Sequence, residues 1–246
     1  MDVDDLIAAI GEQGDLMATA AEKGGAGVTI PTCPEWSMRD LLHHQGEVHR
    51  WATAIVRDAL SSPNAPASPL PGDGELVQWF REGCAALVDV LEHTDPDMEC
   101  FAFLPAPSPL AFWARRQAHE TGIHRVDAEG AAGSITPFAV DLATDGIEEM
   151  LCGFASRSRS RLRSPTPRSL GIRATDAPGA WVVHIGPDSI TVSTGDGHSD
   201  ADCTVEAGAS ELFMLVWNRL GPDDVRLTGD TDVLDLWRTK MRISWS

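Results

Sequence analysis

The sequence predicts an α+β protein with two domains, a helical bundle over residues 1–160 and a small α+β domain over residues 161–246. Long segments of the first part carry apolar residues at helical spacing, whereas the second part contains short β-branched runs separated by Gly, Pro and Asp. The basic, Ser- and Pro-rich stretch SRSRLRSPTPRSLG lies between the two patterns and is typical of a linker.

Five helices are expected in the first part, over residues 2–24, 35–60, 75–94, 111–133 and 138–159. The second helix has the clearest start, because Ser37 is placed to cap it and Asp40 follows three residues later. Trp36 and Leu41 are spaced to form a hydrophobic staple around that cap. The stretch GGAGVTIPTCPE before this helix is expected to be a connector.

The second part is expected to contain four strands, a helix, a fifth strand and a final helix. Strands are expected in the runs SLGIRATD, AWVVHIG, SITVSTG, ADCTVEAG and VRLTGD. Helices are expected over ASELFMLVWNRLG, with Gly221 at its end, and over TDVLDLWRTKMRI. Strands and helices in this order predict a small α+β domain.

The composition limits the classes of function. The 246 residues include 37 Asp and Glu against 19 Lys and Arg, a formal charge of −18 that disfavours binding to nucleic acid or to anionic lipid. No apolar run is long enough to span a bilayer, and the acidic N-terminus does not resemble a secretory signal. The five cysteines show no CxxC pair. A cytoplasmic protein with free thiols is therefore expected.

Three polar side chains are predicted to point into the bundle. His44 lies on the apolar stripe of the second helix, with Leu41 and Val48. Glu120 and His124 lie four residues apart on the fourth helix and therefore share one face. Two imidazoles and a carboxylate suit a catalytic divalent metal such as zinc, with one coordination position left open. Iron, nickel and manganese suit the same set of ligands.

Simpler interpretations of these residues stay open. The Glu120–His124 pair is also typical of a surface ion pair, and a histidine such as His44 on an apolar stripe is often bonded to a carbonyl group. For Asp127 the sequence favours a solvated acid at the helix end over a hydrogen-bond acceptor for a ligand imidazole.

Two segments resemble the mycothiol-dependent maleylpyruvate isomerase family of the DinB-like group. In CPEWSMRDLLHHQGEVHRWA a tryptophan begins the helix and a histidine follows eight residues later, which matches the family's first metal ligand to His44. The segment HETGIHRVDA matches the family's other two ligands to Glu120 and His124. The C-terminal run resembles the family's small second domain, which is similar to sterol-carrier-like folds.

The resemblance implies a DinB-like four-helix bundle that binds a divalent metal, usually zinc. It also implies mycothiol as thiol cosubstrate and a small electrophilic molecule as substrate, giving an isomerase or a thiol S-transferase. A catalytic arginine that binds substrate or thiol corresponds to Arg219, although its neighbours differ from the usual run of small residues. Alternatives are a metal-containing binding protein without catalysis, and a metal-free interaction protein in which His44 pairs with Glu120. The oligomeric state stays open.

Overall fold

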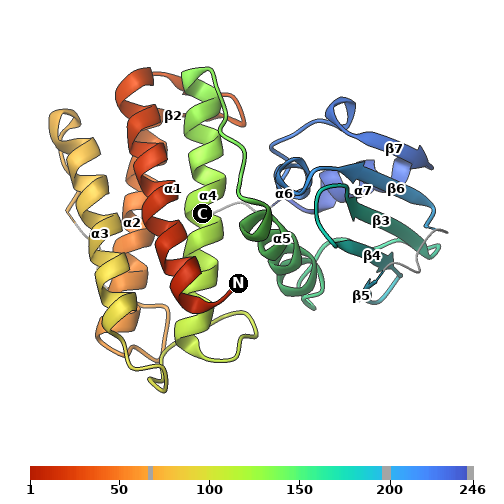
Figure 1. Cartoon of the computed structure of the whole chain (residues 1–246), viewed down its shortest axis with the longest axis horizontal. Helices are drawn as coiled ribbons and strands as arrows, with labels where there is room; N and C mark the ends of the chain where they lie inside the picture. Colours follow the sequence, from red (N-terminus) through yellow and green to blue (C-terminus); the bar gives the residue numbers. More distant parts are fainter. Residues whose placement is uncertain (66–68, 196–200, 243–246) are drawn as a thin grey trace. The chain divides into compact units, whose positions relative to one another are not determined.

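The computed structural model describes residues 1–65, 69–195 and 201–242, and these fall into two compact units, residues 1–136 and 137–246 (Figure 1). The first unit is helical and the second contains a mixed sheet with helices, which confirms the predicted α+β class. None of the helices within the described residues is long and apolar enough to cross a membrane.

Four long helices form the first unit: α1 (Val3–Gly24), α2 (Met38–Arg57), α3 (Leu76–His93) and α4 (Pro109–Ala132). Helix α4 packs mainly against α1, less against α2 and only slightly against α3. Most of its residues are buried, and these lie on every face of the helix. Its hydrophobic pattern is correspondingly weak, because a helix covered on all sides has no exposed polar stripe.

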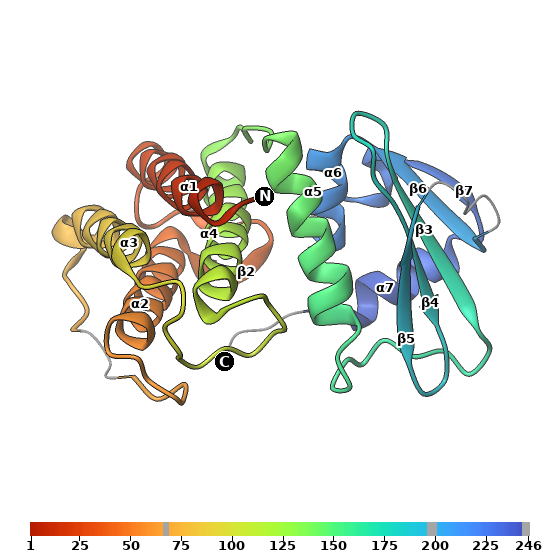
Figure 2. The same cartoon turned by 60° about the horizontal axis from the view of Figure 1, so that its bottom comes forward.

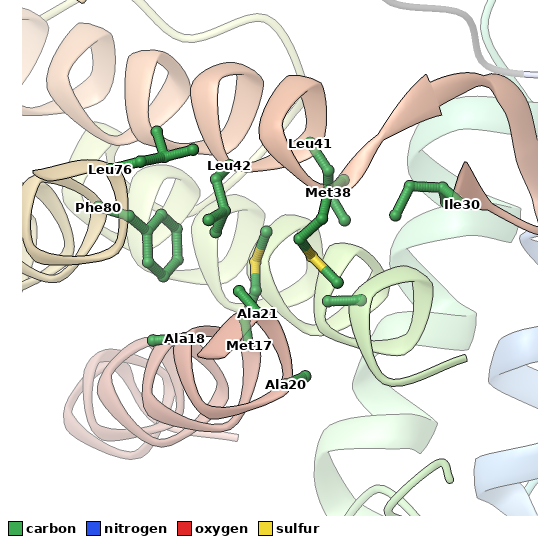
Figure 3. Close-up of a cluster of buried hydrophobic side chains, with 11 residues drawn as sticks. Met17, Ala18, Ala20, Ala21, Ile30, Met38, Leu41, Leu42, Leu76 and Phe80 are labelled. Atoms are coloured by element: carbon green, nitrogen blue, oxygen red, sulfur yellow. The ribbon is translucent and has the colours of Figure 1, made fainter. Parts of the chain in front are cut away.

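A small hairpin precedes α2, where the sequence indicated only a connector. Strands β1 (Thr29–Ile30) and β2 (Cys33–Ser37) pair antiparallel, with Ile30 opposite Cys33. Ile30 is fully buried in a core cluster that also draws on all four helices of the bundle (Figure 3). The apolar side chain of Ile30 thus anchors the hairpin, a tertiary interaction that local pattern does not reveal. A short 3₁₀ turn, η1 (Asp73–Glu75), leads into α3.

The second unit is built on a five-stranded sheet with the order β5-β4-β3-β6-β7. Its strands are β3 (Arg168–Ala174), β4 (Ala180–Ile185), β5 (Ile190–Thr194), β6 (Cys203–Ala207) and β7 (Arg226–Gly229). Strands β3 and β6 pair parallel, whereas the other neighbours pair antiparallel. All five strands expected from the sequence are present. Helices α6 (Ala209–Val216) and α7 (Asp232–Lys240) lie on one face of the sheet (Figure 2). A 3₁₀ turn, η3 (Pro222–Asp224), precedes β7.

The boundary between the units lies earlier than the sequence indicated. Helix α5 (Val140–Glu148) and the π-helical turn η2 (Glu149–Ala155) belong to the second unit, whereas the linker-like stretch placed the boundary at residue 160. Helix α5 packs closely on α6, where the ring of Phe213 leaves no room for a Cβ atom at Gly146. The basic stretch is thus a connection within the second unit, because packing rather than composition decides which elements group together.

Candidate metal centre

The two helices that carry the candidate ligands have well-defined ends. Ser37 caps α2, and the Ser37 backbone N–H donates to the Asp40 carboxylate in a reciprocal capping box, as predicted. Ser108 caps α4, Pro109 occupies its first turn, and Gly133 ends it in the left-handed region. These caps fix the register of both helices, and with it the direction in which each side chain points.

The structure brings His44, Glu120 and His124 together within the bundle. One ligand atom from each side chain lies within 4.8 Å of the others. Oε1 of Glu120 is 3.4 Å from Nε2 of His124 and 4.0 Å from Nε2 of His44. The two imidazole rings lie 5.1 Å apart and almost perpendicular. His44 is partly exposed, whereas Glu120 and His124 are buried, so the cluster has one accessible side.

The two oxygens of Glu120 have different surroundings. Oε2 accepts a hydrogen bond of 2.9 Å from the buried guanidinium of Arg116, one turn earlier on α4. Burial tends to raise the pKa of Glu120, but Arg116 and the two imidazoles outweigh it and hold this pKa below its usual range. Oε1 is buried and accepts no hydrogen bond from the described residues. A negatively charged oxygen in this position fits a cation held between the three side chains.

His124 is oriented by a carboxylate on its other side. Its Nδ1 lies 3.0 Å from Oδ2 of Asp127, and Oδ1 of Asp127 accepts a 2.5 Å hydrogen bond from the Thr32 hydroxyl. Burial lowers the pKa of His124, but Asp127 and Glu120 more than compensate and raise it overall. Asp127 is itself 2% exposed, so the prediction of a solvated acid at the helix end is wrong. The helix is covered on this face too, and only the fold reveals that.

The bundle contains a second cluster of buried polar side chains, which the sequence analysis did not predict. Nε2 of His49 lies 2.9 Å from both the Gln45 amide nitrogen and the Thr121 hydroxyl. Gln45 also donates to Thr121 at 3.2 Å, so the three side chains join α2 to α4. Complete burial lowers the pKa of His49 to about 3, which keeps the imidazole neutral. This group supports the helices beside the ligands.

Arg219 lies in the second unit and is not part of a helix. Helix α6 ends at Val216, earlier than predicted, because Asn218 adopts the left-handed conformation with φ of 60°. The Arg219 side chain donates a hydrogen bond of 2.9 Å to the carbonyl oxygen of Trp217. The expected helix over residues 209–221 is therefore shorter than the pattern indicated. A catalytic role for Arg219 stays a prediction.

Comparison with known families agrees with this architecture. The model of the "Mycothiol maleylpyruvate isomerase N-terminal domain" matches residues 7–129, and that of the "MDMPI C-terminal domain" matches residues 141–236. The chain belongs to the mycothiol maleylpyruvate isomerase family. The N-terminal match includes all three candidate ligands. No curated protein sequence matches the chain.

Solved structures show the same fold. A crystal structure of the mycothiol-dependent maleylpyruvate isomerase shares 13% identity with the chain, covers 93% of each chain and gives a TM-score of 0.63. A histidine-to-alanine mutant of that isomerase gives a TM-score of 0.62 at 14% identity and the same coverage. At this level of sequence identity, the structural likeness establishes the fold of the chain and not its activity. The likeness of the second unit to sterol-carrier-like folds stays a prediction.

Of three residues around the ligands, the sequence analysis did not identify Arg116 or Thr32, and it favoured the wrong environment for Asp127. Arg116 precedes Glu120 by one helical turn, so the pair was visible as an i, i+4 contact but not as a buried one. Asp127 follows His124 by three residues and was recognised only as an alternative. Thr32 is 95 residues from Asp127 in the sequence, and no local signal links the two.

Proposed function

We propose that this protein is a metal- and mycothiol-dependent enzyme that acts on a small electrophilic substrate, as an isomerase or a thiol S-transferase. The observation that carries the proposal is the convergence of His44, Glu120 and His124 around a buried carboxylate oxygen without a hydrogen bond from the described residues. Membership of the mycothiol maleylpyruvate isomerase family supports mycothiol as the thiol. Zinc suits two imidazoles and one carboxylate at a catalytic site, and it is the metal that the family resemblance implies.

The residues of the site would divide the work as follows. His44 and His124 would offer imidazole nitrogens, and Glu120 its free oxygen, to a divalent metal ion. When bound, such an ion lowers the pKa of a coordinated thiol, so that a thiolate exists at neutral pH. Asp127 would keep the proton of His124 on Nδ1, which leaves the Nε2 lone pair directed at the site. Arg116 would hold the second oxygen of Glu120 away from the metal ion.

The reaction follows from the nucleophilicity of a thiolate. Addition of mycothiol sulfur to an activated double bond moves the π electrons onto the substrate and leaves a single bond about which the substrate rotates. Expulsion of the sulfur restores the double bond with the opposite geometry and regenerates the thiolate, which is isomerisation. Protonation of the adduct at carbon instead retains the sulfur, which is S-transfer. Analysis of the product for bound mycothiol separates the two reactions.

Metal analysis of the purified protein tests the ligand set. Wild-type protein is expected to bind a single divalent ion per chain, and His44→Ala to lose it. His43→Ala is the matched control, because His43 is the neighbouring residue and packs edge-on against Trp79. Wild-type protein without metal after reconstitution, or undiminished metal in His44→Ala, would reject the site.

Arg219 would bind a carboxylate of the thiol or substrate, a task suited to a planar guanidinium. Arg219→Lys is therefore expected to keep the metal content of the wild type and to lower the rate of thiol-dependent turnover. Steady-state kinetics together with metal analysis measure both effects. Unchanged turnover in Arg219→Lys would remove Arg219 from the mechanism while leaving the metal centre intact.

A further inference from the structure

The hairpin of β1 and β2 is fixed firmly to the bundle. Ile30 is fully buried and belongs to the same core cluster as Met38 of α2 and Ala128 of α4 (Figure 3). The backbone N–H of Met38 donates to the Val28 carbonyl at 2.8 Å, and that of Arg39 donates to the Ala26 carbonyl at 2.9 Å. These hydrogen bonds join the chain before β1 to the first turn of α2, so the hairpin and the helix form one body.

The turn of the hairpin reaches the outer side of one candidate ligand. Thr32 is exposed, yet its hydroxyl donates a 2.5 Å hydrogen bond to the buried carboxylate of Asp127. The other oxygen of Asp127 bonds to Nδ1 of His124 at 3.0 Å. Thr32, Asp127 and His124 therefore form a continuous chain of contacts from the hairpin to the metal-binding face. The hydroxyl fixes one carboxylate oxygen and thereby the orientation of the other.

The second strand of the same hairpin contacts the other ligand. The ring of Trp36 lies 5.1 Å from the ring of His44, at an angle of 57°. Trp36 also packs against the core cluster that holds Ile30. One short hairpin thus contacts His44 directly through Trp36 and reaches His124 through Asp127, which lies at Nδ1 while Glu120 lies at Nε2.

We propose that the β1–β2 hairpin positions both histidine ligands, with Thr32 acting through Asp127 on His124 and Trp36 acting directly on His44. The inference rests on the proposed metal centre and adds to it a positioning element outside the helices. Groups that hold a ligating histidine from behind fix its ring orientation and raise its affinity for metal. The helices alone supply the ligands, and the hairpin sets the angle at which both imidazoles approach the ion.

Replacement of the Thr32 hydroxyl by a methyl group tests the contact between Thr32 and Asp127. Thr32→Val keeps the shape of the side chain and removes the hydroxyl, and it is expected to weaken cobalt binding about tenfold in a chelator competition. Thr32→Ser restores the hydroxyl and is expected to bind cobalt like the wild type. Thr19→Val is the matched control, because the Thr19 hydroxyl donates to the carbonyl oxygen of Asp15 on the exposed face of α1.

A double-mutant cycle shows whether Thr32 acts through the carboxylate. Asp127→Asn alone is expected to weaken cobalt binding about 10–100-fold. In the Asp127→Asn background, Thr32→Val is expected to have little further effect, since the contact it removes is already lost. The visible absorption bands of the cobalt protein are expected to shift in Thr32→Val and in Trp36→Phe, and to stay unchanged in Thr19→Val.

The outcomes separate the two proposals. Wild-type protein that binds no cobalt would overturn the metal centre and the hairpin's role with it. Wild-type binding with equal affinity and equal spectra in Thr32→Val would overturn only the role of Thr32 in the hairpin. An effect of Thr32→Val that persists in full in the Asp127→Asn background would show that the hydroxyl does not act through Asp127, and would contradict the proposed chain of contacts.

Discussion

Helix α4 contains two Arg–Glu pairs with the same spacing and different surroundings. Arg116 and Glu120 lie 2.9 Å apart, and Arg125 and Glu129 lie 2.7 Å apart, each pair one turn along the helix and buried. Both oxygens of Glu129 accept hydrogen bonds, one from Arg125 and the backbone N–H of Thr136, the other from the Thr136 hydroxyl. In contrast, Oε1 of Glu120 accepts none from the described residues.

The difference distinguishes a structural ion pair from a candidate site. A buried carboxylate oxygen without a hydrogen bond costs about 1–3 kcal/mol, a penalty that the Glu129 pair avoids. Gln13 of α1 further satisfies Arg125 by accepting a hydrogen bond of 2.9 Å. Of the two glutamates in these pairs, Glu120 is the one that keeps an oxygen without a hydrogen bond from the described residues, and two imidazoles face that oxygen. Incomplete satisfaction, rather than the ion pair itself, therefore marks the site.

The largest expected effect is the loss of metal affinity when Glu120 of the Arg116–Glu120 pair is changed. Glu120→Gln removes the charged ligand and is expected to weaken binding more than about 100-fold, beyond the usual effect of changing a residue behind a ligand. Chelator competition with cobalt or zinc measures the affinity. Glu129→Gln, the same substitution in the Arg125–Glu129 pair, is expected to keep the wild-type affinity for the metal. Equal loss of metal in both folded variants would contradict the distinction.

For the free energy of unfolding, the order of the two variants is expected to reverse, with the larger loss in Glu129→Gln. Glu129→Gln leaves the buried guanidinium of Arg125 without its charged partner and is expected to lower the free energy of unfolding by about 3–5 kcal/mol. Denaturant unfolding of the metal-free protein measures this change. In the same metal-free comparison, Glu120→Gln is expected to lose less, because the wild-type carboxylate there is only half satisfied. A larger loss in Glu120→Gln would reverse our assignment of the structural pair.

Two buried histidines extend the comparison to pH. Burial lowers the pKa of His49 to about 3, whereas the carboxylates beside His124 raise its pKa. Between pH 3 and the ordinary histidine pKa of about 6.5, the unfolded chain binds a proton at His49 that the folded chain refuses. His49 thus reduces stability as pH falls through that range, by about 1.4 kcal/mol per pH unit.

The variant His49→Gln removes this titration and leaves that of His124 in place. Between pH 6.5 and pH 5, the metal-free wild type is expected to lose about 2 kcal/mol more unfolding free energy than His49→Gln. Denaturant unfolding at the two pH values provides the measurement. Parallel losses in the two proteins would mean that His49 titrates normally when folded.

The smallest expected effect comes from removing one hydrogen bond to Glu129, so that its Oε1, like that of Glu120, loses its donor. Thr136→Val removes the hydroxyl that donates to Oε1 of Glu129. Because Thr136 is exposed, water replaces part of the lost bond, and a destabilisation of about 1 kcal/mol is expected. Denaturant midpoints resolve a change of this size. A loss as large as that of Glu129→Gln would show that the hydroxyl, not the guanidinium, dominates the pair.

Sequence pattern predicted the fold well where local signals decide it. The capping box at Ser37 and Asp40 was read directly from the sequence, as were the five strands of the second unit. The hairpin containing Ile30 was missed because two-residue strands have no periodicity and the hairpin is held by a distant core. The early end of α6 at Val216 was missed because Asn218 adopts a left-handed conformation inside an apolar run.

The convergence of His44, Glu120 and His124 was predictable because their spacing is a helical property. Glu120 and His124 share a face by geometry alone, and His44 follows from the stripe of α2. The partners behind them were not predictable, because α4 is buried on every face. With no solvent-exposed side, periodicity cannot tell the buried acid Asp127 from a solvated one, nor Glu120 from Glu129. Long-range contacts such as that of Thr32 exist only in the folded chain.

Titration of the cobalt-substituted protein with mycothiol tests the central claim most directly, because it requires both the metal and an open position on it. We expect wild-type protein to bind cobalt and to gain a sulfur-to-cobalt charge-transfer band that saturates at equimolar mycothiol, with Glu129→Gln behaving alike and Glu120→Gln giving no band. A wild-type cobalt spectrum that mycothiol leaves unchanged would contradict the proposed thiol chemistry.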